Sequence, residues 1–174
     1  MRKLYFVCFA LILSIVMILP VTLPVGASPN ENQPVSWVVS SNNENHFYLP
    51  DGHGGHVIFV KLLSNETTVG RVKIFDRVTH MVLVSTGFDQ TPGATRFWEE
   101  DGAKVAEFVA FVEANEFAQF PYNYLVKVKY QIWDYDEPGR QDYHLVWGSF
   151  GGDFLEPPLR YDYSAGQAQV HIGN

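Results

Sequence analysis

The sequence predicts a mainly β protein with a β-sandwich or jelly-roll-like architecture and one short helix. Three observations support this class. β-Branched and aromatic residues crowd into short segments, turn residues separate these segments, and some segments alternate apolar with polar positions. The clearest alternation lies at 124–133, where one face carries apolar and aromatic side chains: Val126, Val128, Tyr130 and Ile132.

The other expected strands follow the same signals. Residues 57–63 form a nearly continuous apolar run, which is typical of a strand buried on both faces. Residues 70–76 and 79–85 are expected to pair antiparallel. A turn at 136–139, which contains Pro138 and Gly139, is expected to join 124–133 to 143–147 in a hairpin. The remaining predicted strands are 35–40, 95–98 and 167–172.

One segment has the periodicity of a helix. Val105, Phe108, Val109 and Val112 recur at helical spacing, which predicts a helix over about 101–116 with Asp101 as its N-cap. The alternative is a strand entered through a tight turn at Asp101-Gly102.

The N-terminal segment 1–27 has the features of a signal peptide. A short basic head precedes an uncharged run from Leu4 to Leu19, and Val25-Gly26-Ala27 resembles a signal peptidase site. We therefore expect cleavage before Ser28, a flexible leader over 28–34, and a single β-rich domain over 35–174. An uncleaved membrane anchor is the alternative, because the apolar stretch is nearly long enough to span a bilayer.

Cysteine content and net charge indicate where the protein acts and which classes of partner it does not bind. The only cysteine, Cys8, lies in the signal segment, so the mature chain needs no disulfide, which favours bacterial export and an extracellular location. Without Arg2 and Lys3 the chain has ten basic and nineteen acidic residues, a formal charge of −9. Because no run of basic residues occurs along the chain, we expect no binding to nucleic acid and none to membranes after signal removal. The sequence indicates no oligomeric state.

A histidine-rich loop is the candidate metal site. His46, Asp51, His53 and His56 could supply imidazole and carboxylate ligands for zinc or copper. The alternative is a glycine-rich turn that leads into the strand at Val57 and carries its histidines incidentally.

An acidic turn is a candidate for calcium. Asp134 and Asp136 lie beside the Pro138-Gly139 turn, and carboxylates on a turn can hold this ion. The alternative is a solvated acidic loop, since the ligand alternation of an EF-hand is absent.

Aromatic residues provide the candidate ligand-binding side chains. Tyr135, Tyr161 and Tyr163 lie among acidic and turn residues, and exposed tyrosines suit contacts with sugars or protein partners. Ordinary packing is the alternative explanation.

No catalytic motif stands out in the sequence. Thiol chemistry has no mature cysteine, and Gly148-Ser149-Phe150-Gly151 lacks the spacing of a nucleophile elbow. The sequence therefore favours a secreted, non-catalytic binding or interaction module for carbohydrate or a protein surface. The alternatives are a small secreted hydrolase with a dispersed site and a metal-binding protein.

Overall fold

The computed structural model describes residues 33–42, 54–119, 122–136, 141–162 and 168–173, all within the compact unit Glu31–Asn174. In these ranges the protein is mainly β, as predicted, and its helical structure is limited to a 3-10 turn at Tyr122–Tyr124. The strands are β1 (Pro34–Asn42), β2 (Gly54–Leu63), β3 (Thr68–Asp76), β4 (Val82–Phe88), β5 (Arg96–Glu100), β6 (Ala103–Ala114), β7 (Lys127–Asp134), β8 (Tyr143–Ser149), β9 (Leu159–Asp162) and β10 (Ala168–His171).

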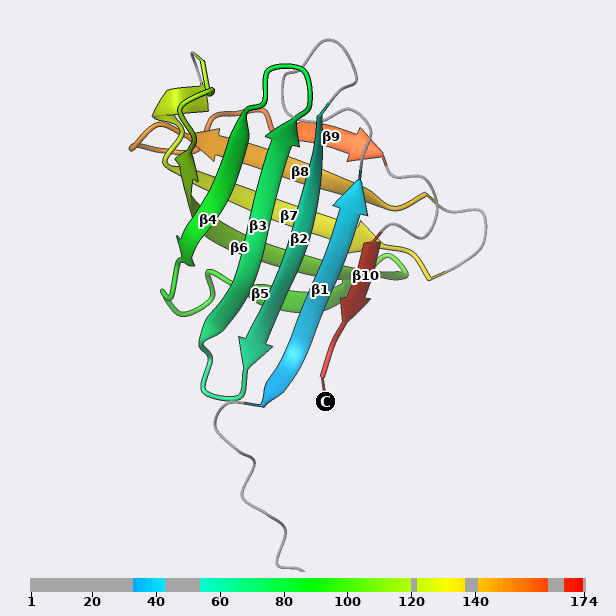
Figure 1. The fold of residues 1–174 in the computed structure, drawn as a ribbon. Coiled ribbons are helices and arrows are strands. Elements are labelled where there is room, and N and C mark those ends of the chain that lie inside the picture. The colour runs from blue at the N-terminus through cyan, green and yellow to red at the C-terminus, as the bar shows by residue number, and fades with distance from the viewer. Residues whose placement is uncertain (1–32, 43–53, 120–121, 137–140, 163–167, 174) are drawn as a thin grey trace, which may run out of the picture. The chain divides into compact units, whose positions relative to one another are not determined.

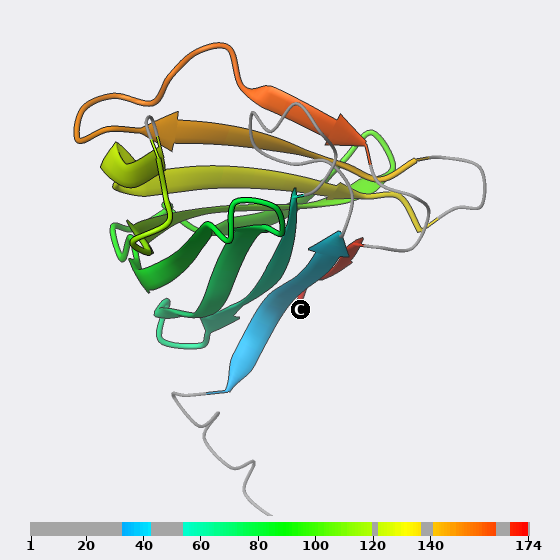
Figure 2. The same ribbon diagram turned by 45° about the horizontal axis from the view of Figure 1, so that its top comes forward.

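The strands form one curled antiparallel sheet in the order β10-β1-β2-β3-β4-β6-β7-β8-β9, and β5 pairs with β6 beside this path. Neighbours follow chain order except that β4 pairs with β6 instead of β5 and that β10 pairs with β1. The sheet is therefore a meander, and the crossovers between sheets that define a jelly roll are not seen in it. Figures 1 and 2 show β1 to β4 crossing obliquely over β6 to β9, which gives a sandwich-like arrangement.

The core lies between these two halves of the sheet. Alternate positions of each strand point inward, as the pleat requires. Phe108 of β6 and Tyr130 of β7 stack at 5.5 Å between ring centroids, and both side chains are buried. They pack with aliphatic side chains from both halves: Val38, Ile58, Val60, Val72, Ile74, Leu83, Val128, Ile132, Val146 and Val170.

Both predicted hairpin pairings are confirmed. β3 and β4 pair antiparallel with Lys73 opposite Val84, and β7 and β8 pair with Lys129 opposite Trp147. The turn at 137–140 lies outside the described residues. The sequence prediction missed β9, a strand of four residues that pairs with β8.

The predicted helix over 101–116 is wrong, because this segment is the hairpin strand β6. Asp101 and Gly102 both have positive φ angles, which suit a tight turn between β5 and β6. β6 is paired on both edges and is largely buried on both faces from Ala103 to Ala110, so apolar residues occupy most positions. This double burial hides the period of two and produces an apparent helical stripe.

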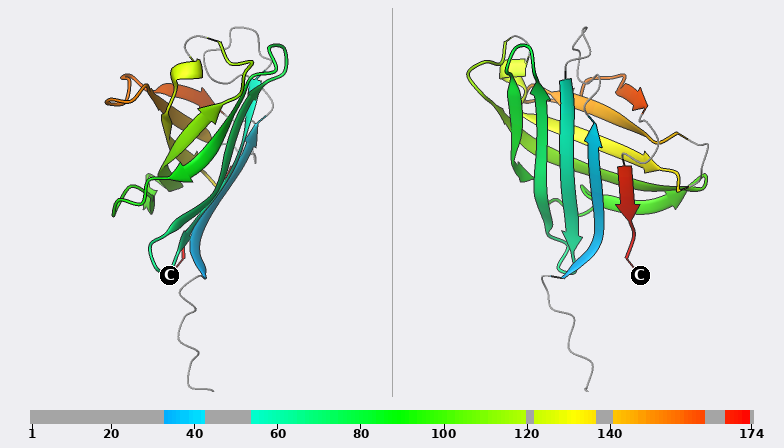
Figure 3. Two further views of the ribbon diagram at one scale, coloured as in Figure 1. Left: turned by 60° about the vertical axis from the view of Figure 1, so that its left-hand side comes forward. Right: turned by 45° about the vertical axis from the view of Figure 1, so that its right-hand side comes forward.

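The prediction that residues 57–63 are buried on both faces is also wrong. In β2, His56, Ile58 and Val60 are buried, whereas Val57 and Phe59 keep 47% and 41% of their surface exposed. β2 lies between β1 and β3, and β6 to β9 lie on its inner side only (Figure 3). An apolar run in this strand therefore has one face in the core and one face outside.

A buried carboxylate links the two halves of the sheet. The Val170 amide of β10 donates a hydrogen bond of 2.7 Å to Asp134 Oδ2 at the end of β7. Both residues are buried. Burial raises the pKa of the Asp134 carboxyl, and nearby Asp136 and Asp142 raise it further, although the bond to Val170 and the charge of Lys104 act in the opposite direction.

The buried hydrogen bond between Val170 and Asp134 predicts opposite effects of two Asp134 substitutions on stability. Asp134→Ala should lower the free energy of unfolding by about 1–3 kcal/mol, because the buried Val170 N–H loses its acceptor. Asp134→Asn keeps an acceptor and removes a charge whose burial is unfavourable, so it should stabilise the protein near neutral pH. Because the folded pKa exceeds the unfolded value of 3.8, the penalty on the wild type grows as pH rises through and above 3.8. Urea unfolding of all three proteins across the acidic range up to neutral pH measures this, and a constant difference between wild type and Asn would contradict it.

Candidate interaction surface

The structure places one of the predicted metal ligands, His56, in the core. Its Nε2 lies 2.9 Å from Ser40 Oγ, and its ring meets His144 edge-on at 4.9 Å between centroids. His144 was not among the predicted site residues, although alternation along β8 places it inward between outward-facing Tyr143 and Leu145. His46, Asp51 and His53 lie outside the described residues, so the zinc or copper site stays a prediction.

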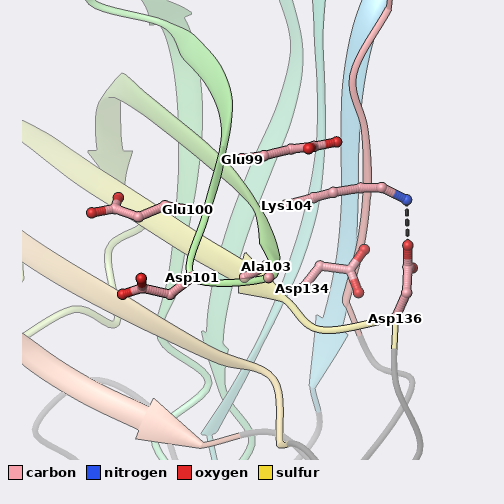
Figure 4. A pocket seen from close by; sticks show the side chains of 8 residues that line it. Glu99, Glu100, Asp101, Ala103, Lys104, Asp134 and Asp136 are labelled. Atoms are coloured by element: carbon pink, nitrogen blue, oxygen red, sulfur yellow. Dashed lines mark hydrogen bonds and ion pairs between the residues drawn. The ribbon is translucent and has the colours of Figure 1, made fainter.

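The carboxylates considered for calcium line a pocket of about 360 Å³ at the β5–β6 turn. Lys104 Nζ forms an ion pair with Asp136, which raises the pKa of the lysine, and Asp134 accepts the Val170 amide. Figure 4 shows Glu99 on the same side as these groups, whereas Glu100 and the neighbouring Asp101 point away. Among the described residues no group of three or more histidine, cysteine or acidic side chains is arranged to hold a metal, and the calcium site stays a prediction.

Among the three predicted tyrosines, Tyr135 is the one whose side chain the structure describes. It is half-buried, its ring centroid lies 6.4 Å from that of Tyr143, and its backbone amide donates to Asp142 Oδ1 at 2.9 Å. Burial raises the pKa of the Tyr143 hydroxyl. Tyr161 lies in β9 opposite His144, and Tyr163 is outside the described residues.

Aromatic rings on the outer side of β5 to β9 pack against one another and against cations. Tyr143 lies between Trp133, stacked at 5.4 Å, and the guanidinium of Arg160, 3.9 Å from its centroid. Lys129 Nζ similarly lies 4.0 Å from the Trp147 centroid. Sugars stack on the flat faces of rings, and these contacts already cover ring faces. We therefore expect these aromatic residues to pack within the protein and not to bind sugars.

The other half of the sheet exposes a contiguous apolar and cationic surface on its outer side, which we call the β1–β3 outer face. Val39 and Val69 are each 38% exposed, and Val57 and Phe59 are more exposed still. Cross-strand register makes these neighbours, because Val39 lies opposite Phe59 and Lys61 opposite Val69. The face consists of Trp37, Val39, Val57, Phe59, Lys61, Val69, Arg71 and Lys73.

Each cation of the β1–β3 outer face has apolar neighbours across the strands. Lys61 lies between Trp37 and Val69. Arg71 lies opposite Phe59, and Lys73 lies between Val57 and Val84. Lys61 Nζ is also 4.7 Å from the Phe59 ring centroid. Across the strands, each cation of the face therefore lies opposite an apolar group.

Acidic side chains are excluded from this half of the sheet. Asp76 is the only acidic residue in β1, β2, β3, β4 and β10, and it is buried. In the next strand, β6, Glu113 lies opposite Val84 of β4. In the part of the chain that the structure describes, Arg96, Lys104 and Arg160 form salt bridges with the protein's own carboxylates, but the cations of the β1–β3 outer face form none.

The β1–β3 outer face was not predicted from the sequence because its cations are not consecutive. Lys61 belongs to β2, whereas Arg71 and Lys73 belong to β3, and only the pairing of the two strands brings them together. In the sequence, Arg71 and Lys73 alternate with the apolar residues Val72 and Ile74, and this alternation was the available sign that both cations lie on one outer side. A search for runs of basic residues does not detect such a pattern.

No helix in the described ranges is long and apolar enough to cross a membrane. The chain matches no protein-family model, no curated protein and no solved structure.

Proposed function

We propose that this protein is a secreted, non-catalytic interaction module that binds the surface of a partner protein through the β1–β3 outer face. The observation that carries the proposal is the exposed apolar half of β2. Val57 and Phe59 lie in the middle of a face that no described element covers. Contiguous apolar surface of this kind marks interaction sites in soluble proteins.

The choice of a protein partner over carbohydrate follows from the side chains available. Four of the eight residues of the β1–β3 outer face are aliphatic or benzyl groups with no polar atom: Val39, Val57, Phe59 and Val69. Sugar sites need convergent hydrogen-bonding groups beside a flat ring. Protein interfaces instead combine an apolar centre with aromatic side chains and arginine, and Phe59 beside Arg71 provides this combination. The histidine-loop and hydrolase alternatives stay predictions.

Site-specific photo-crosslinking tests the proposal. A photoreactive phenylalanine analogue at position 59 should form an adduct with an extracellular protein of the producing cells. The same analogue at Phe150, which is 44% exposed and outside the face, should not form that adduct. Excess unmodified protein should suppress the adduct, whereas a Phe59→Glu variant should not. Equal adducts from both positions, or none from position 59, would contradict this function.

A further inference from the structure

We infer that the partner presents an acidic polypeptide segment whose carboxylates meet Lys61, Arg71 and Lys73 while its apolar side chains cover Val57 and Phe59. This inference rests on the proposed function and specifies the chemistry of the partner. The β1–β3 outer face carries three positive charges and no negative charge, so a partner of complementary charge has to be acidic.

The arrangement of the face limits how a partner can bind. Lys61 and Arg71 lie on the adjacent strands β2 and β3, whereas Arg71 and Lys73 occupy alternate positions of β3 and so share its outer side. Across the pair Arg71 lies opposite Phe59 and Lys73 opposite Val57, so an opposing chain that crosses β2 and β3 has to place carboxylates beside apolar groups on one side. An extended acidic segment does this, since its side chains at alternate positions share one side.

The partial exposure of the lysines favours a negatively charged partner over a purely apolar one. Lys61 and Lys73 contact ring faces, at 4.7 Å from the Phe59 centroid and 5.7 Å from the Phe75 centroid. Both lysine side chains are half-buried, so part of each stays exposed to a partner. A neutral apolar partner would cover these charges without any counter-charge, which is unfavourable. Carboxylates facing them remove that cost and steer the encounter.

An anionic bilayer is the main competing source of negative charge, and the geometry of the face argues against it. The exposed apolar side chains stand on paired strands rather than on a projecting loop. Neighbours already cover more than half of the surface of each of Val39, Val57, Phe59 and Val69. Only their outer parts could enter a lipid headgroup region. A polypeptide can pack closely on such a face.

The test uses the secreted protein, uniformly labelled with ¹⁵N, and a synthetic peptide that repeats Ser-Phe-Ser-Glu. Amide shifts should move in β1, β2 and β3 upon titration, and the affinity should fall as salt is added. The Arg71→Glu/Lys73→Glu variant should lose about tenfold or more in affinity. Lys127→Glu/Lys129→Glu is the matched control, because it makes the same charge change at the same spacing on the outer side of β7 and should leave affinity unchanged.

The competing outcomes are distinguishable. A peptide with lysine in place of glutamate that binds equally well would overturn the acidic partner, as would binding that ignores the Arg71→Glu/Lys73→Glu change. Sedimentation of the protein with phosphatidylglycerol vesicles, lost in that variant, would assign the face to membrane instead. If position 59 crosslinks to a protein but the charge reversal has no effect on that adduct, the interaction function holds and the acidic partner fails. If position 59 forms no adduct, the interaction function itself fails.

Discussion

Replacing Phe108 with alanine should lower the free energy of unfolding by about 3–5 kcal/mol, the range for removing a buried phenylalanine from a close-packed core. Phe108 is fully buried on the central strand β6. It stacks on Tyr130 and meets Phe88 edge-on at 6.2 Å between centroids. Alanine would leave a cavity between the two halves of the sheet that its neighbours can fill only in part. Denaturant unfolding followed by tryptophan fluorescence measures the change.

Phe59→Ala is the control for this measurement. Phe59 also lies in the middle of a strand, but it is on the outer face and 41% exposed. Its loss should cost about 1 kcal/mol or less, which is the scale of strand propensity and cross-strand pairing. A comparable loss at both positions would show that Phe59 contributes to the core. That result would also remove the reason for assigning it to an interaction surface.

Gly70→Ala should destabilise the protein by about 3 kcal/mol or more, since a methyl group at this position meets both backbone strain and a collision. Gly70 has φ +144°, which side-chain-bearing residues rarely adopt. A Cβ atom there would lie 2.0 Å from the carbonyl oxygen of Phe59 on the paired strand β2. Relief would require β2 and β3 to separate at the centre of the β1–β3 outer face.

Gly87→Ala provides the matched comparison. Gly87 lies in β4, its φ is outside the left-handed region, and no atom lies within 4 Å of the position of an added Cβ. The substitution should change stability by about 1 kcal/mol or less. Thermal unfolding of the two variants and the wild type decides the matter. If Gly70→Ala unfolds at the temperature of Gly87→Ala, the close approach of β2 and β3 described here is incorrect.

The sequence was sufficient to predict the class of the fold and most of its strands, because one-sided burial leaves a period of two. β7 shows this period clearly, with Val128, Tyr130 and Ile132 inward. The prediction was wrong where this relation between burial and period breaks down. Most of β6 is buried on both faces and imitates a helix, whereas β2 has apolar residues on both faces and is buried on one.

The interaction surface was harder to predict than the strands, since it depends on register. Val39 and Phe59 are far apart in the sequence, and so are Phe59 and Arg71, yet both pairs are cross-strand neighbours. A change of register by one residue would place Val57 and Phe59 in the core and Ile58 and Val60 outside. Apolar residues occupy both sets of positions in β2, and its local indication of the outward set is a single charge, Lys61, which shares the side of Val57 and Phe59.

The pairing of β10 with β1 has a consequence for biosynthesis. β1 gains its second neighbour from residues 168–171 of β10, which are made after every other described strand, and Trp37 pairs with His171 where β1 meets β10. Until these residues emerge, the nascent chain keeps β1 as an open edge beside exposed Val39, and such edges pair readily with other chains. A chain that ends before Ala168 should therefore be prone to association. The pairing of β1 with its second neighbour has to wait until β10 is made, which delays it compared with a sheet closed by local hairpins alone.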